Sequence, residues 1–429
     1  MTLLLSLACT GPGAFGPDDH KGHDGGRGDD SGQHGHQDGD ADTDADADAD
    51  ADADGDADGD ADGDADADAD ADSGDTATPA DCSGAARTID LTGQIDKDDV
   101  WCPQDTVQLH GWIGVLPSVT LTIFPGTTVR GMPAEDGKEA GSLNIKAGAI
   151  LVAEGSSALP IVFTSLAGTD EGEGWGGLRL TGLAPGADNP GGNAGDSSGT
   201  VRYVRIEHVH DSTLTYAVDG FQLTDVGSGT VIDHVEVRDT ADDAINITGG
   251  TAVLNRIVTI DSPDESVQWQ DGFVGAITEL YARNCGGNGL DGRNRDPAVE
   301  SVDTEPRSAP TISNVTIDGA PSAGLSLKNG SGGVVSNALL TQVDCGVKAD
   351  ATVLATLSHV MVFGGDAACD VASGTAYGSK ITIADPALSG YMPAAGSPAL
   401  DPANADASVS DHVGAFGTED WAAGWTSGL

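Results

Sequence analysis

Residues 243–292 read DAINITGGTAVLNRIVTIDSPDESVQWQDGFVGAITELYARNCGGNGLDG. Within this stretch Ile245, Val267 and Leu290 are each the centre of a short apolar segment, and the steps between them are 22 and 23 residues. A second apolar segment follows each one, and no helical period is sustained. A period of this length, built from short strands alone, predicts a solenoid in which each coil stacks on the one before it.

The same pattern continues on both sides of this stretch. Phe221, Leu325 and Val347 are centred in the same way, with steps of 24, 35 and 22 residues. The long step contains an inserted loop at 293–310. The second segments lie at 232–237, 254–259, 277–282, 312–317, 335–340 and 357–362. The Leu and Asn framework of a leucine-rich repeat is absent, and a β-propeller blade needs about 40 residues. We therefore predict an all-β parallel β-helix.

Alternation along each short segment divides its residues between the core and the solvent. The apolar centres and the residues two positions further on, Trp269 among them, are expected to point inward. The intervening residues are expected to form two outward columns. The first comprises Gln222, Asn246, Gln268, Asp291, Ser326 and Lys348, and the second comprises Thr224, Thr248, Gln270, Arg293 and Lys328. Their amide and carboxylate groups suit hydrogen bonding to sugar hydroxyls, so we predict glycan contacts at Gln222, Asn246, Gln268, Gln270 and Asp291.

A turn precedes each second segment. His234, Asn314, Asn337 and His359 occupy equivalent positions there. Asn tolerates the left-handed conformation that a tight turn requires, so this column is predicted to be structural rather than catalytic.

Carboxylates gather next to the outward columns. Stacked on neighbouring coils they repel, so a cation must bridge them, or their pKa values rise, or solvent screens them. Asp219, Asp243 and Glu265 are the candidate ligands, and calcium is the cation whose oxygen-rich coordination fits them. Asp243, Asp291 and Arg293 could instead support acid–base cleavage of a sugar chain. The simplest alternative is structural, because Asp and Asn punctuate β-helix turns for backbone reasons alone.

Four of the cysteines fit two disulfides. Cys345 and Cys369 both precede an inward Val by two residues, which places them on adjacent coils about 4.8 Å apart, within disulfide range. Cys82 and Cys102 could join the two ends of an amino-terminal cap. Cys285 is left over and is expected to be a buried thiol. Disulfides indicate an oxidising compartment.

The charge of the chain excludes some partners. There are 69 acidic and 19 basic side chains, so 69 − 19 gives −50. Residues 1–80 hold 24 of the acidic and 2 of the basic residues, which leaves 45 − 17 = −28 for residues 81–429. Nucleic acid and anionic lipid headgroups both require a basic surface, so neither is an expected partner.

The amino terminus reads MTLLLSLAC, an apolar run that ends at Cys9. It resembles a bacterial lipoprotein signal with Cys9 as the lipidated residue, which implies contact with a membrane only through a lipid anchor. From Asp40 to Asp72 the sequence is nearly pure Asp-Ala and cannot bury a core, so it is expected to be a disordered tether. We divide the chain into a signal (1–9), a tether (10–80), an amino-terminal cap (81–118), a β-helix (119–385) and a carboxy-terminal cap (386–429).

Three segments carry a family resemblance. VTLTIFPGTTVRG (119–131), GSLNIKAGAILVAEGSSALPIVFTS (141–165) and GWGGLRL (174–180) resemble exported bacterial right-handed β-helix proteins of the pectin-lyase-like type. VGAFGTEDWAAGWTSGL (413–429) is similar to the terminal cap of that group, which implies that Phe416, Trp421 and Trp425 cover the last coil. Members with known chemistry are polysaccharide lyases and hydrolases. The Gly-His-Gly motif of polygalacturonase-like hydrolases is absent, and Asp242-Asp243 resembles only part of their Asp trio.

The first functional hypothesis is an exported, outer-membrane-anchored lipoprotein, monomeric, that displays a rigid rod for binding or adhesion to a polysaccharide or cell-envelope component. The second is a calcium-dependent polysaccharide lyase or glycoside hydrolase that acts on the outer face. A third, a structural spacer, would have neither property.

Overall fold

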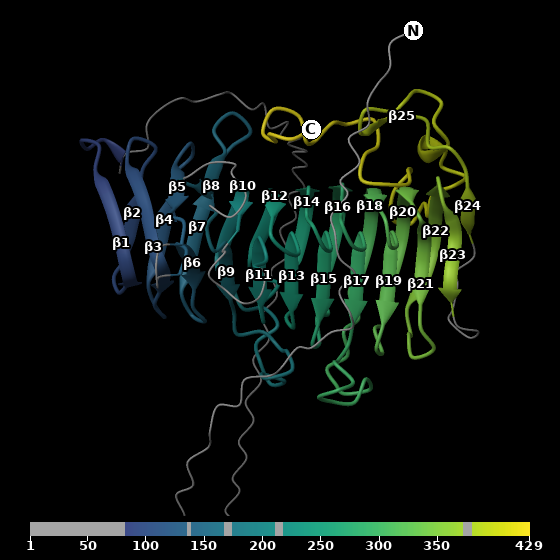
Figure 1. The fold of residues 1–429 in the computed structure, drawn as a ribbon, viewed down its shortest axis with the longest axis horizontal. Coiled ribbons are helices and arrows are strands. Elements are labelled where there is room, and N and C mark those ends of the chain that lie inside the picture. Colours follow the sequence, from purple (N-terminus) through teal and green to yellow (C-terminus); the bar gives the residue numbers. More distant parts are fainter. Residues whose placement is uncertain (1–81, 135–138, 167–173, 211–217, 372–379) are drawn as a thin grey trace, which may run out of the picture. The chain divides into compact units, whose positions relative to one another are not determined.

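The computed structural model describes residues 82–134, 139–166, 174–210, 218–371 and 380–429, which form a parallel β-helix (Figure 1). No helix within these ranges is long and apolar enough to cross a membrane. The signal and tether predicted for residues 1–80, including Cys9, lie outside the described residues. The elements are β1 (Thr88–Ile95), β2 (Asp99–Trp101), β3 (Thr106–Val115), β4 (Thr120–Ile123), β5 (Thr128–Gly131), β6 (Ser142–Ile145), β7 (Ile150–Glu154), β8 (Ile161–Ser165), β9 (Leu178–Thr181), β10 (Gly199–Val209), β11 (Phe221–Thr224), β12 (Val231–Thr240), β13 (Ile245–Thr248), β14 (Val253–Ile260), β15 (Val267–Gln270), β16 (Ala276–Arg283), β17 (Leu290–Arg293), β18 (Thr311–Ala320), β19 (Leu325–Lys328), β20 (Val334–Val343), β21 (Cys345–Ala349), β22 (Thr356–Phe363), β23 (Asp366–Val371), β24 (Ile381–Ile383), β25 (Leu388–Ser389), β26 (Met392–Pro393) and the short 3₁₀ helix η2 (Pro398–Leu400).

Each coil has three faces. The long strands serve two of them, as β10 shows: its first residues pair with β7 and its later ones with β8, with Tyr203 between them in the left-handed region at φ 49°. We call the short strands β9, β11, β13, β15, β17, β19 and β21 face A, and the first and second halves of the long strands faces B and C. The corner between B and C is left-handed in every long strand from β10 to β22, at Tyr203, His234, Arg256, Glu279, Asn314, Asn337 and His359.

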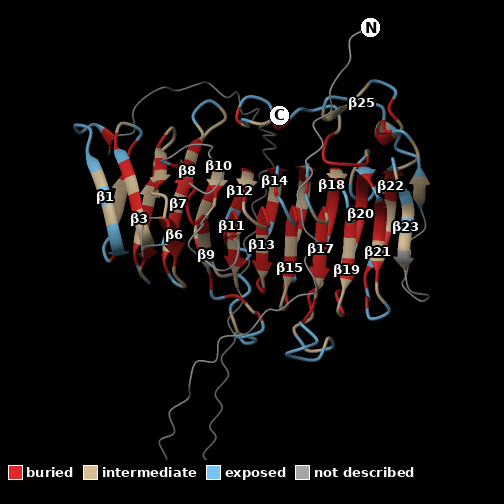
Figure 2. Ribbon diagram, in the orientation of Figure 1, coloured by how far each residue is buried: buried red, intermediate tan, exposed pale blue. Residues whose placement is uncertain are grey.

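The predicted register of face A is confirmed. Parallel pairing joins Phe221 to Ile245, Ile245 to Val267, Val267 to Leu290, Leu290 to Leu325, and Leu325 to Val347. All of these side chains are buried in one continuous apolar core, which Figure 2 shows as buried segments along the strands.

Trp269 belongs to that core, as its position in the alternation predicted, and its side chain is 1 % exposed. Gly292 pairs with it on the next coil, and a Cβ there would lie 2.1 Å from the indole ring. The glycine of the LDG segment is therefore the residue that makes room for the indole.

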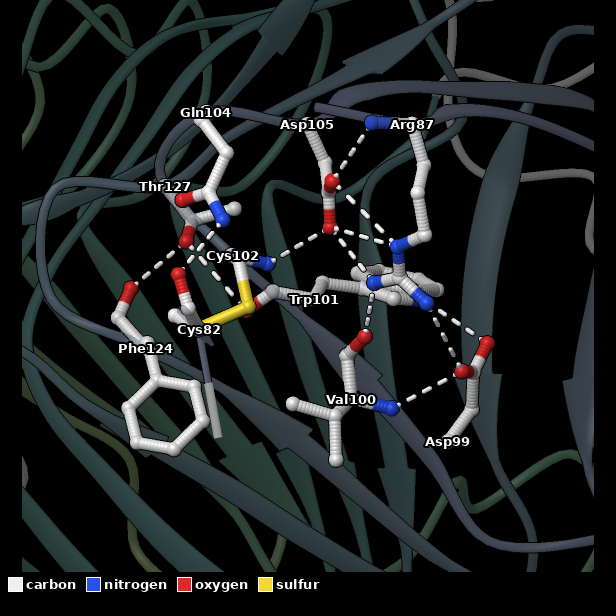
Figure 3. Close-up of polar contacts among 10 residues, drawn as sticks. All are labelled: Cys82, Arg87, Asp99, Val100, Trp101, Cys102, Gln104, Asp105, Phe124 and Thr127. Atoms are coloured by element: carbon white, nitrogen blue, oxygen red, sulfur yellow. Dashed lines mark hydrogen bonds and ion pairs between the residues drawn. A yellow bond between two sulfur atoms is a disulfide. The ribbon is translucent and has the colours of Figure 1, made fainter. Parts of the chain in front are cut away.

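Coil stacking begins earlier than expected. β1 pairs in parallel with β3, so the β-helix starts at Thr88, within the segment predicted to be a cap. The Cys82–Cys102 disulfide and the buried Asp105 fasten this end, as Figure 3 shows: Asp105 accepts hydrogen bonds from Arg87 Nε (3.2 Å) and from the Cys102 amide (3.0 Å). An alternating Thr, Ile, Asp, Leu strand can add a coil while the disulfide holds its start, which explains the earlier boundary.

The second disulfide, Cys345–Cys369, is also present, and Cys285 is a buried free thiol. The register behind the Cys345–Cys369 prediction was wrong by a few residues. Val347 pairs with Ala368, and a bulge follows before Ala349 pairs with Val371. The bulge absorbs the difference between the two coils, so the cysteines still meet.

Phe416, Trp421 and Trp425 do not cover the last coil, which corrects the prediction of a terminal cap. Residues 406–429, here called the strap, run back along the β-helix: Asp406 bonds to Asn337, and the Gly428 amide donates to Glu236, four coils nearer the amino terminus. In Figure 1 the strap is the yellow segment above the long strands. The strap lies along the long strands because the outward column of face C is largely apolar and the strap buries it. The column consists of Glu236, Val258, Tyr281, Thr316, Leu339 and Met361.

Candidate functional site

Face A presents polar side chains outward. Its first outward column has the predicted order, since Gln222 pairs with Asn246, Asn246 with Gln268, and Gln268 with Asp291. Pairing extends the column one coil toward the amino terminus to Arg179. Gln222, Asn246 and Gln268 are partly exposed, so they can meet a ligand from solvent.

Five carboxyl groups lie where the chain enters the strands of face A, and we call them the carboxyl cluster. Asp219, Asp243 and Glu265 each stand two residues before the paired residues Phe221, Ile245 and Val267, so they stack on successive coils. Asp242 directly precedes Asp243 in the sequence, and Asp264 directly precedes Glu265.

Neighbouring amides hold the inner part of the cluster. Asp243 accepts hydrogen bonds from Asn246 Nδ2 at 3.2 Å and from the backbone amide of Glu265 at 3.1 Å. Asn288 Nδ2 donates to Glu265 Oε1 at 2.8 Å. Asp243 and Glu265 are buried, whereas Asp242 is partly exposed and Asp264 is exposed. The cluster therefore has a fixed inner layer and an outer layer that faces solvent.

Burial and like charge keep the protons on this cluster. Burial, followed by the charge of Asp242, raises the pKa of Asp219 to about 7, although Arg179 partly opposes the shift. Burial and the nearby Asp264 raise the pKa of Glu265 to about 7. Burial, Asp219 and Glu265 also raise the pKa of Asp243 well above its usual range. Protonated and ionised carboxyl groups can thus coexist near neutral pH, as acid–base chemistry requires.

One oxygen each from Asp242, Asp243 and Asp264 lie within 4.8 Å of one another, close enough to bind a single cation. This set shares only Asp243 with the predicted ligands Asp219, Asp243 and Glu265. An all-oxygen donor set suits calcium or magnesium rather than a thiolate- or imidazole-seeking metal. Binding of calcium by this set is a prediction.

The contacts do not join Arg293 to the carboxyl cluster. Its guanidinium donates to Gln270 Oε1 and Gln268 Oε1, both at 2.6 Å. Asp291 is fully buried, and its Oδ2 lies 3.1 Å from Lys328 Nζ. Of the predicted catalytic residues Asp243, Asp291 and Arg293, only Asp243 belongs to the cluster itself, while Asp291 lies near enough to Glu265 to raise its pKa.

The sequence indicated the Asp242-Asp243 pair and placed Asp219 only among the candidate cation ligands, not as the third member of an Asp trio. Asp219 lies one coil earlier; its charge raises the pKa of Asp243, and the charge of Asp242 raises the pKa of Asp219. The 24-residue step from Asp219 to Asp243 was the available signal.

Comparison with known proteins agrees with the architecture. The family model described as a pectate-lyase-like β-helix domain matches residues 93–426. The catalytic domain of a GH87 α-1,3-glucanase variant, solved with tetrasaccharides, is 13% identical over 70% of this chain and 63% of that one, with a TM-score of 0.36. The Dettilon tailspike protein is 12% identical over 64% of this chain and 61% of its own, with a TM-score of 0.25. This chain therefore spans less than two thirds of either structure. No curated protein matches it.

Proposed function

The chain belongs to the family of pectate-lyase-like β-helix domains, and from that premise we propose that it is a glycoside hydrolase that binds a polysaccharide along face A and cleaves it at the carboxyl cluster. The observation that carries the proposal is the gathering of Asp219, Asp242 and Asp243 on two adjacent coils, where burial and mutual repulsion raise the pKa values of Asp219 and Asp243. Glycoside hydrolysis requires one carboxyl group that donates a proton and a second that is ionised.

We assign the proton donor to Asp219. It is partly exposed, and its pKa of about 7 keeps it protonated at mildly acidic pH, so it can protonate the glycosidic oxygen as the bond to the leaving sugar breaks. Asp242, on the next coil and also reachable from solvent, is the carboxylate that attacks the sugar or activates a water. Asp243, which is buried, would position both, while burial and the charge of Asp242 keep the pKa of the donor high.

The outward columns would hold the sugar chain. Gln222, Asn246 and Gln268 offer amide donors and acceptors at steps of about 4.8 Å, the spacing of stacked coils, and Gln270 lies two residues beyond Gln268 on β15. The second candidate function is binding of a polysaccharide without cleavage. Arg293 favours it, because hydrogen bonds to two glutamine oxygens hold its guanidinium in a fixed position on the surface. A calcium ion at Asp242, Asp243 and Asp264 belongs to this second candidate, because it would occupy the carboxylate that cleavage requires and would hold sugar oxygens for binding.

We propose an exported protein, held at the cell surface through a lipid on Cys9 and acting as a monomer. The two disulfides support an oxidising compartment. Metabolic labelling with a radioactive fatty acid, compared between the wild type and Cys9→Ser, tests the anchor.

The experiment that tests the enzymatic proposal uses the full chain with neutral, acidic and amino-bearing polysaccharides. New reducing ends are expected with the wild type and not with Asp219→Asn, while both still bind the polysaccharide. Binding by both without new reducing ends would favour the second candidate.

A further inference from the structure

One tryptophan of this chain lies outside the core. The chain has six tryptophans, and Trp112 differs from the others in being partly exposed. It belongs to none of the apolar clusters of the described residues, and within them its indole N–H meets no hydrogen-bond acceptor. The other five are buried, and they are Trp101, Trp175, Trp269, Trp421 and Trp425. The indole of Trp112 is therefore available to a ligand from solvent.

Trp112 lies on the outward side of the sheet that carries face A. This sheet continues toward the amino-terminal end of the β-helix, because β9 pairs with β6 and β6 pairs with the second half of β3. Trp112 is opposite Ser142 there, and Ile113 is opposite Leu143. Ile113 is fully buried in the core, so the alternation along β3 places its neighbours Trp112 and Gly114 on the outward side.

Gly114 makes room for the indole on this surface. A Cβ at Gly114 would lie 2.4 Å from Cζ3 and 2.6 Å from Cη2 of Trp112. The six-membered ring thus occupies the place where any other side chain at position 114 would be. Gly114 pairs with Asn144, Asn144 with Arg179, and Arg179 with Gln222. The ring therefore lies at the amino-terminal end of the first outward column of face A.

Lys146, which follows β6, approaches the same ring. Its Nζ lies 4.1 Å from the centroid of the Trp112 indole. In the part of the chain that the structure describes, this ammonium makes no hydrogen bond and no ion pair. A cation–π contact near solvent is weak, so a ligand that packs on the ring can displace the ammonium. The flexible side chain of Lys146 can then donate hydrogen bonds to oxygens of that ligand.

Resting on the polysaccharide binding proposed above, we propose that Trp112 is a stacking platform for a sugar ring, and that the polysaccharide runs from the carboxyl cluster to the amino-terminal end of face A. β3 lies three coils before β11, about 14 Å at the spacing of stacked coils. The C–H groups of a pyranose pack well against the negatively polarised face of an indole. Arg179, partly exposed between the two ends, would donate to sugar oxygens on the way. The site thus favours long chains over short oligosaccharides.

Acrylamide quenching of tryptophan fluorescence tests contact with the ring, because the other five indoles are buried. The full chain with Asp219→Asn, which is expected to bind without cleaving, is titrated with hexasaccharides of β-1,4-linked glucose, β-1,4-linked mannose and α-1,4-linked galacturonic acid. At least one hexasaccharide should lower the quenching about two-fold, and adding Trp112→Phe should abolish that change. A hexasaccharide that binds in calorimetry without altering the quenching would overturn the proposal.

Steady-state kinetics separate a binding role from a structural one. Trp112→Ala should raise KM for the cleaved hexasaccharide about ten-fold and leave kcat nearly unchanged, because a ring stacked far from the scissile bond contributes equally to substrate and transition-state binding. Trp112→Tyr should restore most of the lost affinity. Phe124→Ala, which removes a partly exposed aromatic side chain just after β4, is the matched control and should keep the wild-type KM.

The outcomes distinguish this proposal from the hydrolase proposal. A wild-type KM in Trp112→Ala, in a chain that still cleaves, would overturn the stacking platform and leave the hydrolase proposal intact. Protection of Trp112 from acrylamide by a hexasaccharide that the wild type never cleaves would do the reverse. Absence of binding by all three hexasaccharides would overturn both.

Discussion

Asn288 donates its side-chain amide to Glu265 one coil before it, with 2.8 Å between Nδ2 and Oε1. The bond joins two successive coils where the chain enters face A, beside the backbone hydrogen bond that the Ser266 amide donates to the Asn288 carbonyl at 3.3 Å. It also fixes one carboxyl group of the cluster that we propose to be catalytic. Its donor is neutral, so it stabilises the carboxylate less than an Arg or a Lys would.

Asp242→Asn should reduce polysaccharide cleavage at least 100-fold, because an amide can neither attack the sugar nor activate a water. The fold should persist, since the side chain is partly exposed and the substitution preserves its shape. The rate of appearance of reducing ends measures the effect, and circular dichroism checks the fold. Asp261→Asn, with the same change in charge, should retain full activity. Equal losses in both variants would argue against a role for the cluster.

Stability should fall as the pH rises from 5 to 8. Glu265 has a pKa raised from 4.5 to about 7 in the folded chain, so between these values the folded state binds more protons than the unfolded state. The free energy of unfolding therefore decreases with increasing pH through this window, by on the order of 3 kcal/mol for this group alone. Urea unfolding midpoints at pH 5 and pH 8 measure the loss.

Glu265→Gln is the matched variant for that measurement, because a neutral amide has no pH dependence. Its midpoint should change less between pH 5 and pH 8 than that of the wild type. A wild-type midpoint that rises with pH would contradict the raised pKa.

Much of the fold could be predicted because each coil repeats one apolar centre. The spacing of Phe221, Ile245 and Val267 determines the pairing of their strands, and their alternation determines which neighbours point outward. The left-handed corners at Asn314 and Asn337 were predictable as well, because Asn favours that conformation. Tyr203 and Arg256 hold the same conformation without such a preference, so only the stacked coils reveal it.

The strap could not be predicted from its own residues. Phe416, Trp421 and Trp425 indicate that the segment buries aromatic rings, but where it docks depends on an apolar column assembled from Val258, Tyr281 and more distant residues. The carboxyl cluster was predictable in part. The stacking of its members on successive coils follows from the register. Their burial depends on side-chain packing, which the spacing of residues in the sequence does not predict.

Trp425→Ala should destabilise the fold by about 3–5 kcal/mol, the usual cost of truncating a buried aromatic side chain. The indole is 1 % exposed and lies edge-on to His234, with 5.6 Å between ring centroids. Denaturant unfolding measures the change, and Trp112→Ala, at a partly exposed indole, is the control that should cost much less. Equal costs would show that the strap adds little to stability.

Lys328→Met should cost about 2–4 kcal/mol, because it leaves the fully buried Asp291 without its ion-pair partner. Replacing both residues, with Asp291→Asn added to Lys328→Met, should restore part of the loss, since the remaining amide carries no charge. A double-mutant cycle of unfolding free energies gives the coupling. Additive losses would contradict the pairing.

Hydrolysis of a polysaccharide at the carboxyl cluster is tested by mass spectrometry of products formed in water enriched in oxygen-18. A hydrolase must add one water at each cleaved bond, so we expect shortened chains whose new ends carry one heavy oxygen, and none from Asp219→Asn. Unsaturated products without the heavy oxygen would show a lyase instead. Polysaccharides left intact by the wild type would contradict the claim outright.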